Sequence, residues 1–221
     1  GAIAVTTVAA GNPNNVTLVS TGAITEDGQT STVLSANRLT VTAAGPVTLD
    51  TAVVSAVVTT TAAGDIDIDE TDAVTLTSVV TNNGSITVDA GGSLSVATLT
   101  ANTAKNVTLT TSGSITEDGD SATLVTAGAL TATTSGSVTL DTNVNTVTIA
   151  AGGTGGIDID ETNAISLLSV VTSNGSIDVN AGGAIAVTTV AAGNPNNVTL
   201  VSTGAITEDG QTSTVLSANR L

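Results

Sequence analysis

The residues of this sequence with the clearest potential for chemistry are its aspartates, several of which alternate with an apolar residue. Ile66-Asp-Ile-Asp69 recurs as Ile157-Asp-Ile-Asp160. A further aspartate follows each motif, Asp89 after the first and Asp178 after the second. Several carboxylate oxygens held close together suit Ca²⁺ or another hard cation. The alternative is a solvated acidic stripe that binds no ion. The candidate calcium ligands are Asp67, Asp69 and Asp89 in one set, and Asp158, Asp160 and Asp178 in the other.

Three glutamates stand just before an Asp-Gly pair: Glu26, Glu117 and Glu208. Period-two alternation from the preceding isoleucine would turn each of these carboxylates inward. A buried carboxylate without hydrogen-bond partners is costly, because ionised groups lose their hydration. We therefore expect the strand to end at each glutamate, and the side chain to cap the Asp-Gly turn through backbone amides.

The sequence contains few of the residue types that catalytic sites use. The chain has no His and no Cys, and its one lysine, Lys105, stands in a turn-like segment. Nucleophilic catalysis needs a base beside the nucleophile, and that base is most often a histidine. Paired carboxylates could hydrolyse glycosides, but such a site also needs aromatic or basic groups to hold the sugar. We therefore expect that the protein is not an enzyme and uses no cofactor, apart from the calcium considered above.

Composition narrows the classes of partner. The chain has 221 residues with 19 acidic and three basic side chains, a formal charge of −16, and no aromatic residue. Phosphate recognition rests on Lys and Arg, so we expect no nucleic-acid partner. No apolar run approaches about 18 residues, so we expect no membrane insertion. Val, Ile, Leu, Ala and Thr favour strands, whereas Gly, Asn and Asp favour the turns between them.

An internal repeat organises the whole chain. Residues 1–39 recur without change at residues 183–221, an offset of 182 positions, and a diverged half-period of 91 lies inside it. Residues 85–175 form one complete 91-residue repeat, with partial repeats at 1–84 and 176–221. No insertion or deletion interrupts this spacing, so each repeat is a fixed structural length. We expect one continuous domain over residues 1–221, cut as a window from a longer repetitive chain.

Each 91-residue repeat divides into four shorter units, and each unit holds three short segments of alternating apolar residues. Such strands are unstable alone, but stacked coils give them backbone partners and bury their inward faces. The pattern predicts an all-β, right-handed parallel β-solenoid with three short strands per coil and about four coils per repeat, each repeat about 19 Å tall. Stacking should bring Asp69 to Asp89, and Asp158 to Asp178, about 5 Å apart. It should also put Asp158 in the coil next to Thr131.

Two runs carry a family resemblance. The run from Asn106 to Gly119 (NVTLTTSGSITEDG) and the run from Gly128 to Leu140 (GALTATTSGSVTL) resemble the repeats of filamentous-haemagglutinin-type exoproteins, the large bacterial adhesins exported by two-partner secretion. The resemblance extends along the whole chain. It implies a right-handed parallel β-helix, export to the cell surface, and a role in attachment or matrix formation.

Two hypotheses of function follow from these observations. The first is a structural shaft of an extracellular bacterial fibre or giant adhesin, which mediates surface attachment, filament formation or matrix formation. The second is a binding module whose acidic Thr/Asp face holds Ca²⁺, glycans or a neighbouring fibre. The expected partners are further copies or continuations of the same solenoid, together with a host or neighbouring-cell surface. Uniform repetition favours the shaft, because a recognition site would break the pattern locally.

Overall fold

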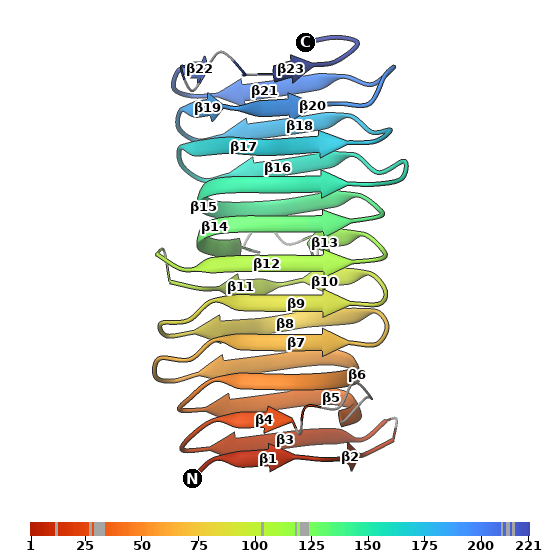
Figure 1. The fold of residues 1–221 in the computed structure, drawn as a ribbon, viewed down its shortest axis with the longest axis vertical. Helices are drawn as coiled ribbons and strands as arrows, with labels where there is room; N and C mark the ends of the chain where they lie inside the picture. Colours follow the sequence, from red (N-terminus) through yellow and green to blue (C-terminus); the bar gives the residue numbers. More distant parts are fainter. Residues whose placement is uncertain are drawn as a thin grey trace.

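The computed structural model describes residues 1–11, 13–26, 28, 34–102, 104–117, 119, 124–208, 210, 213 and 215–221. Within these ranges the chain forms 23 β-strands and no helix, and the strands pair into one wound sheet. The strand pairs are parallel from the first coil to the last. Figure 1 shows the strands stacked one above another, with the two termini at opposite ends of the stack. The prediction of a parallel β-solenoid is confirmed.

The solenoid has two broad faces, which Figure 1 shows as bright strands in front and fainter strands behind. We call them the front face and the back face, and the edges joining them the left and right edges of Figure 1. The front face contains β1 (Ile3–Val5), β2 (Val8–Ala9), β4 (Ile24–Glu26), β7 (Ile66–Glu70), β9 (Ile86–Ala90), β12 (Asn106–Thr111), β17 (Ile165–Thr172), β19 (Ile185–Val187), β20 (Thr189–Ala191), β22 (Ile206–Glu208) and β23 (Val215–Ser217).

The back face runs in the opposite direction. It contains β3 (Asn15–Ser20), β8 (Val74–Thr81), β10 (Leu94–Val96), β11 (Thr98–Thr100), β13 (Ile115–Glu117), β16 (Ile157–Glu161), β18 (Ile177–Ala181) and β21 (Val198–Ser202). Four longer strands bend around an edge and contribute to both faces: β5 (Leu34–Ala43), β6 (Val47–Thr60), β14 (Leu124–Thr134) and β15 (Val138–Ala151).

The 91-residue repeat spans four and a half turns, not about four as the sequence suggested. Along the front face, Ile3 pairs with Ile24, which pairs with Val47, and the column continues through Ile66 and Ile86. Ile3 recurs 91 residues later as Leu94, but Leu94 pairs with Val74 on the back face. Each repeat therefore ends half a turn out of phase with its start, and only the 182-residue period returns to the same face, after nine turns.

Some turns do contain three strands, as predicted, but the three strands form two faces and not three. In one turn the chain forms β9, β10 and β11 as predicted, yet β10 and β11 both pair with β8 on the back face. A register shift in the β6–β8 pairing explains this arrangement, because one extra residue interrupts the alternation without turning the chain. The extra half-turn of the repeat has a different origin. Within β15 the chain turns an edge, because Val138 pairs with Ile115 on the back face and Val147 pairs with Leu130 on the front face.

The core is a thin aliphatic layer between the two faces. Ile86 and Val88 of β9 are fully buried, whereas Thr87 and Asp89 point outward. The covering turn supplies much of this burial: Ile24 is 0% exposed, but the identical Ile206 in the last turn is 49% exposed. Burying one such side chain contributes about 1.5–3 kcal/mol. Because the two faces lie so close, Val, Ile, Leu and Ala fill the space that aromatic rings would overfill.

Glycines at the edges permit close approach between successive turns. At the left edge, a Cβ on Gly84 would lie 2.1 Å from the backbone oxygen of Gly64 in the turn below. Beside it, the buried Thr81 hydroxyl donates to the Gly84 carbonyl oxygen at 2.9 Å and accepts from the Gly84 N–H at 2.6 Å. The edge is therefore held by a short hydrogen-bonded turn that leaves no room for a side chain.

The contact at Gly84 yields a test of the stacking. Gly84→Ala should lower the free energy of unfolding by about 1–3 kcal/mol. The added methyl group would overlap the backbone of Gly64 and push the two successive turns apart. The matched control is Gly152→Ala, whose Cβ would lie 3.3 Å from the Thr134 oxygen. Thermal unfolding followed by circular dichroism measures both variants. Equal melting temperatures for the two variants would contradict the described packing.

Candidate functional site

The outward aspartates lie in columns that run along the solenoid axis. Asp69 of β7 pairs with Asp89 of β9, and Asp158 of β16 pairs with Asp178 of β18. These are the two adjacencies that the sequence predicted, and neighbouring strands in a sheet lie about 4.8 Å apart. The aspartates are outward because they alternate with buried isoleucine and valine residues. The pairing therefore brings together the residues within each predicted set.

The two predicted sets lie on opposite faces of the molecule. Asp67, Asp69 and Asp89 are on the front face, whereas their counterparts on β16 and β18 are on the back face. The half-turn offset of the 91-residue repeat causes this inversion. It also corrects the predicted neighbour of Asp158, which pairs with Thr139, while Thr131 pairs with Thr148. The two acidic sets cannot act as one site.

Two further aspartates extend the columns and were missed in the sequence. Asp50 of β6 pairs with Asp69, so the front column contains Asp50, Asp69 and Asp89. Asp141 of β15 pairs with Asp160 on the back face, where the next residue in the column is Asn180. The shared motif Val-Thr-Leu-Asp, at 47–50 and 138–141, was the available signal. Using it required the pairing between turns, which the sequence did not give.

Partial burial and repulsion between carboxylates disfavour the charged forms of Asp67 and Asp69 on the front face. Burial raises the pKa of Asp69, and the neighbouring carboxylates of Asp67, Asp50, Asp89 and Glu26 raise it further. Burial also raises the pKa of Asp67, with a contribution from Asp89.

The back face shows the same effect. Burial raises the pKa of Asp158, and repulsion from Asp160, Asp178 and Asp141 adds to it. The pKa of Asp141 is raised by burial and by Asp160. Each column is thus a line of like charges on the outer surface.

The columns do not form a coordination shell. Among the described residues, no three acidic side chains converge closely enough to hold a metal ion. A calcium site requires six to eight oxygens around one centre. Successive strands instead place these carboxylates in a row along the surface, with their side chains side by side. This arrangement attracts cations diffusely, and it does not favour the predicted calcium site.

The predicted turn caps occupy three related positions. Glu26 is half-buried, and its carboxylate accepts a hydrogen bond from the backbone N–H of Gly28, which is the contact expected of a cap. Gly28, Gly119 and Gly210 all have φ near +80°, the left-handed region that favours glycine. Glu117 is half-buried like Glu26, whereas Glu208 is exposed in the last turn. The aspartates of these three turns lie outside the described residues.

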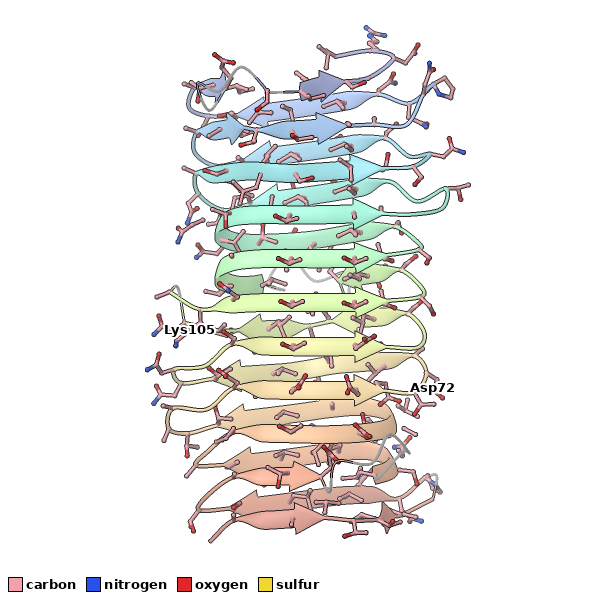
Figure 2. All side chains as sticks on the ribbon, viewed as in Figure 1. Asp72 and Lys105 are labelled. Carbon is pink, nitrogen blue, oxygen red and sulfur yellow. The ribbon has the colours of Figure 1, made fainter. Side chains whose placement is uncertain are left out.

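A second pair of glutamates, which the sequence analysis missed, lies inside the edges, with Glu70 at the right edge and Glu161 at the left edge. Glu70 and Glu161 end the two Ile-Asp-Ile-Asp-Glu strands, and each is only 4% exposed. The Glu70 carboxylate accepts from the Thr51 hydroxyl at 2.8 Å and from the Val53 N–H at 3.0 Å. A third and longer contact comes from the N–H of Asp72, which Figure 2 labels at the right edge. Strict alternation from Ile66 was the signal that could have placed Glu70 inside.

Glu161 repeats this arrangement half a turn out of phase. Its carboxylate accepts from the Thr142 hydroxyl at 2.8 Å and from the N–H groups of Val144 and Asn163, both at 3.0 Å. Burial raises the pKa of both glutamates, and these hydrogen bonds oppose the rise only in part. Each glutamate ties the end of its strand to the turn below.

Comparisons with protein-family models, with curated proteins and with solved structures found no match for this chain. The fold therefore defines the class of protein, which is a repetitive parallel β-solenoid. None of the described segments forms a helix that is long and apolar enough to cross a membrane.

The raised pKa values predict a protein that is more stable in mild acid than at neutral pH. A group whose pKa is higher in the folded state binds protons preferentially there, so its contribution is greatest below the unfolded pKa and is lost as pH rises through the folded pKa. The six carboxyl groups of the described residues whose pKa shifts are given above all shift upward. The melting temperature should therefore be higher near about pH 4, the unfolded value for carboxyl groups, than near about pH 7.

The double variant Glu70→Gln and Glu161→Gln isolates the buried pair. Glutamine resembles the neutral acid, so the variant should show a shallower fall in melting temperature between mild acid and neutral pH. The exposed Glu208→Gln serves as the matched control and should leave the slope unchanged. A melting temperature that rises toward neutral pH would contradict the described burial.

Removal of divalent cations tests the calcium hypothesis. Thermal melts with and without excess EDTA, at fixed ionic strength, should coincide, because the aligned carboxylates do not surround a common centre. A lowered melting temperature in EDTA that calcium restores would revive the predicted site, and Asp69→Asn with Asp160→Asn would then locate it.

Proposed function

We propose that this chain is part of the structural shaft of an extracellular bacterial fibre or giant adhesin, and that it mediates surface attachment, filament formation or matrix formation. The observation that carries the proposal is the phase of the repeat. Residues 1–39 and 183–221 are identical in sequence, and their equivalent strands β1 and β19 lie nine turns apart on the same face. An uninterrupted repeat of this kind extends a rod by a fixed amount without changing its cross-section.

The packing suits a rod that carries load along its axis. Each turn pairs with the next through parallel backbone ladders on both faces, as Ile86–Ala90 does with the strands below and above it. Successive turns also share a continuous aliphatic core. Pulling the ends of the rod apart would have to break a whole ring of hydrogen bonds and expose a layer of this core.

The acidic surface suits a rod that stays soluble beside other rods of its kind. The formal charge of −16 keeps rods soluble and separated at low ionic strength, since like-charged surfaces repel. The half-turn offset gives both faces the same kinds of residue, so a fibre could meet neighbours on either side. The resemblance to filamentous-haemagglutinin-type repeats supports this assignment through the runs starting at Asn106 and Gly128.

The alternative is a binding module whose acidic columns hold cations, glycans or a neighbouring fibre. The alignment of Asp50, Asp69 and Asp89 favours attraction of cations. It does not favour a defined ligand, because the carboxylates face solvent in a row. We place the shaft first for this reason. A catalytic role is not part of the proposal, since the sequence offers no histidine or cysteine to serve it.

The test is to locate the chain on producing cells. Antibodies raised against the recombinant solenoid should label surface filaments along their whole length in electron cryotomography of unpermeabilised cells. Averaged filaments should show an axial repeat of about 22 Å for four and a half turns, or about 43 Å for nine turns, at 4.8 Å per turn. Label confined to the cell interior would refute the shaft, and label restricted to filament tips would favour the binding module.

A further inference from the structure

The chain contains two Asn-Gly pairs, in equivalent turns of successive repeats. Asn83-Gly-Ser-Ile86 lies at the left edge between β8 and β9, and Asn174-Gly-Ser-Ile177 lies at the right edge between β17 and β18. Both asparagines are exposed and both glycines are buried. The four residues from each asparagine onward are identical, so the fold is the main source of any difference in their chemistry.

Asparagine before glycine is the pairing most prone to spontaneous loss of ammonia. The backbone nitrogen of the glycine attacks Cγ of the asparagine, and the missing Cβ leaves the approach open. In both turns packing enforces the glycine, because a Cβ on Gly84 or Gly175 would lie 2.1 Å from the backbone oxygen of the turn below. The solenoid therefore retains a reactive pair for reasons of packing.

The hydroxyl of a buried threonine restrains the attacking nitrogen, and it does so unequally in the two turns. The Gly84 N–H donates to Thr81 Oγ1 at 2.6 Å. The Gly175 N–H donates to Thr172 Oγ1 at 3.2 Å, and the same oxygen also accepts from the Gly193 N–H at 3.3 Å. A longer, shared hydrogen bond holds the nitrogen more weakly. Gly175 is therefore the freer nucleophile.

The electrophile also differs between the two turns. Asn196 Nδ2 donates to Asn174 Oδ1 at 3.0 Å. Asn196 Nδ2 also donates to the backbone oxygen of Gly193 at 2.7 Å, which holds the Asn196 side chain in place. A donor on the carbonyl oxygen stabilises the oxyanion that forms when Cγ is attacked. Lys105 stands in the sequence position equivalent to Asn196 relative to Asn83, at the left edge in Figure 2. Within the described residues, no hydrogen bond reaches the Asn83 side chain.

We propose that Asn174 is a site of spontaneous deamidation in the folded protein, promoted by Asn196 and by the weakened hold of Thr172 on the Gly175 nitrogen. The bond from Gly175 N to Asn174 Cγ forms, and the bond from Cγ to the side-chain nitrogen breaks. That nitrogen leaves as ammonia, which carries the proton that Gly175 N has lost. Water then opens the resulting succinimide at either carbonyl and yields aspartate or isoaspartate. No oxidant or enzyme is required.

The products would alter the right edge. Either product adds a negative charge, which the Asn196 amide would bind more strongly than the neutral carbonyl. Isoaspartate also adds a methylene group to the main chain, directly before the glycine whose carbonyl accepts from Thr172 Oγ1 at 2.5 Å. The edge would then lose its tight fit over the turn below. This inference does not depend on the proposed shaft function.

The experiment compares the two sites within one molecule. Purified protein is incubated in mildly alkaline buffer at physiological temperature, and peptide mapping by mass spectrometry follows the exchange of ammonia for water at Asn83 and Asn174. In the folded chain Asn174 should react at least roughly five-fold faster, the factor that one hydrogen bond is worth. In denaturant the two rates should become similar, because the same Gly-Ser-Ile segment follows both asparagines.

A pair of variants tests the assigned donor. Asn196→Ala should slow the reaction at Asn174 by roughly five-fold. Asn82→Ala removes a comparable edge contact, the bond from Asn82 Nδ2 to Thr61 O at 3.3 Å, and should leave Asn174 unaffected. Circular dichroism verifies that both variants are folded. Equal rates at the two sites in the folded chain, a faster reaction at Asn83, or protection of both sites until denaturation would each overturn the proposal.

Discussion

The structure depends on the backbone hydrogen-bond ladder between successive turns. Parallel pairing at about 4.8 Å forces each residue to lie over a residue of the turn below, so the chemistry of one turn constrains the next. Ile24 is fully buried where a turn covers it, and the identical Ile206 is half exposed where none does. Neither the short strands nor the thin core would be stable in a single turn, so stability belongs to the stack and not to any one coil.

The same ladder explains why polar and small residues gather at the edges. There the chain must reverse while keeping the spacing of the faces, so backbone approaches backbone at Gly84 and leaves no room for a Cβ. Buried polar side chains then satisfy the turns: Thr81 and Glu161 at the left edge, and Glu70 at the right. The Glu70 carboxylate can be buried because three donors surround it. Its raised pKa shows that burial still disfavours the charged form.

On the outer surface the ladder has the opposite effect and brings like charges together. Asp50, Asp69 and Asp89 repel one another because the pairing between successive turns places them side by side. The half-turn offset spreads this repulsion over the front and back faces instead of doubling it on one. A rod of this kind is acidic on both sides, and the repulsion between its surface carboxylates depends on ionic strength and pH.

The sequence by itself determined the fold class and the adjacency of Asp69 to Asp89, because alternation and an indel-free repeat are local and periodic signals. It did not determine the number of turns per repeat, the face on which Asp158 lies, the role of Asp50, or the burial of Glu70. These features depend on where the chain turns an edge and where a single residue bulges, as in β8 opposite β6. Alternation is the same on both faces, so only the pairing of whole turns could separate them.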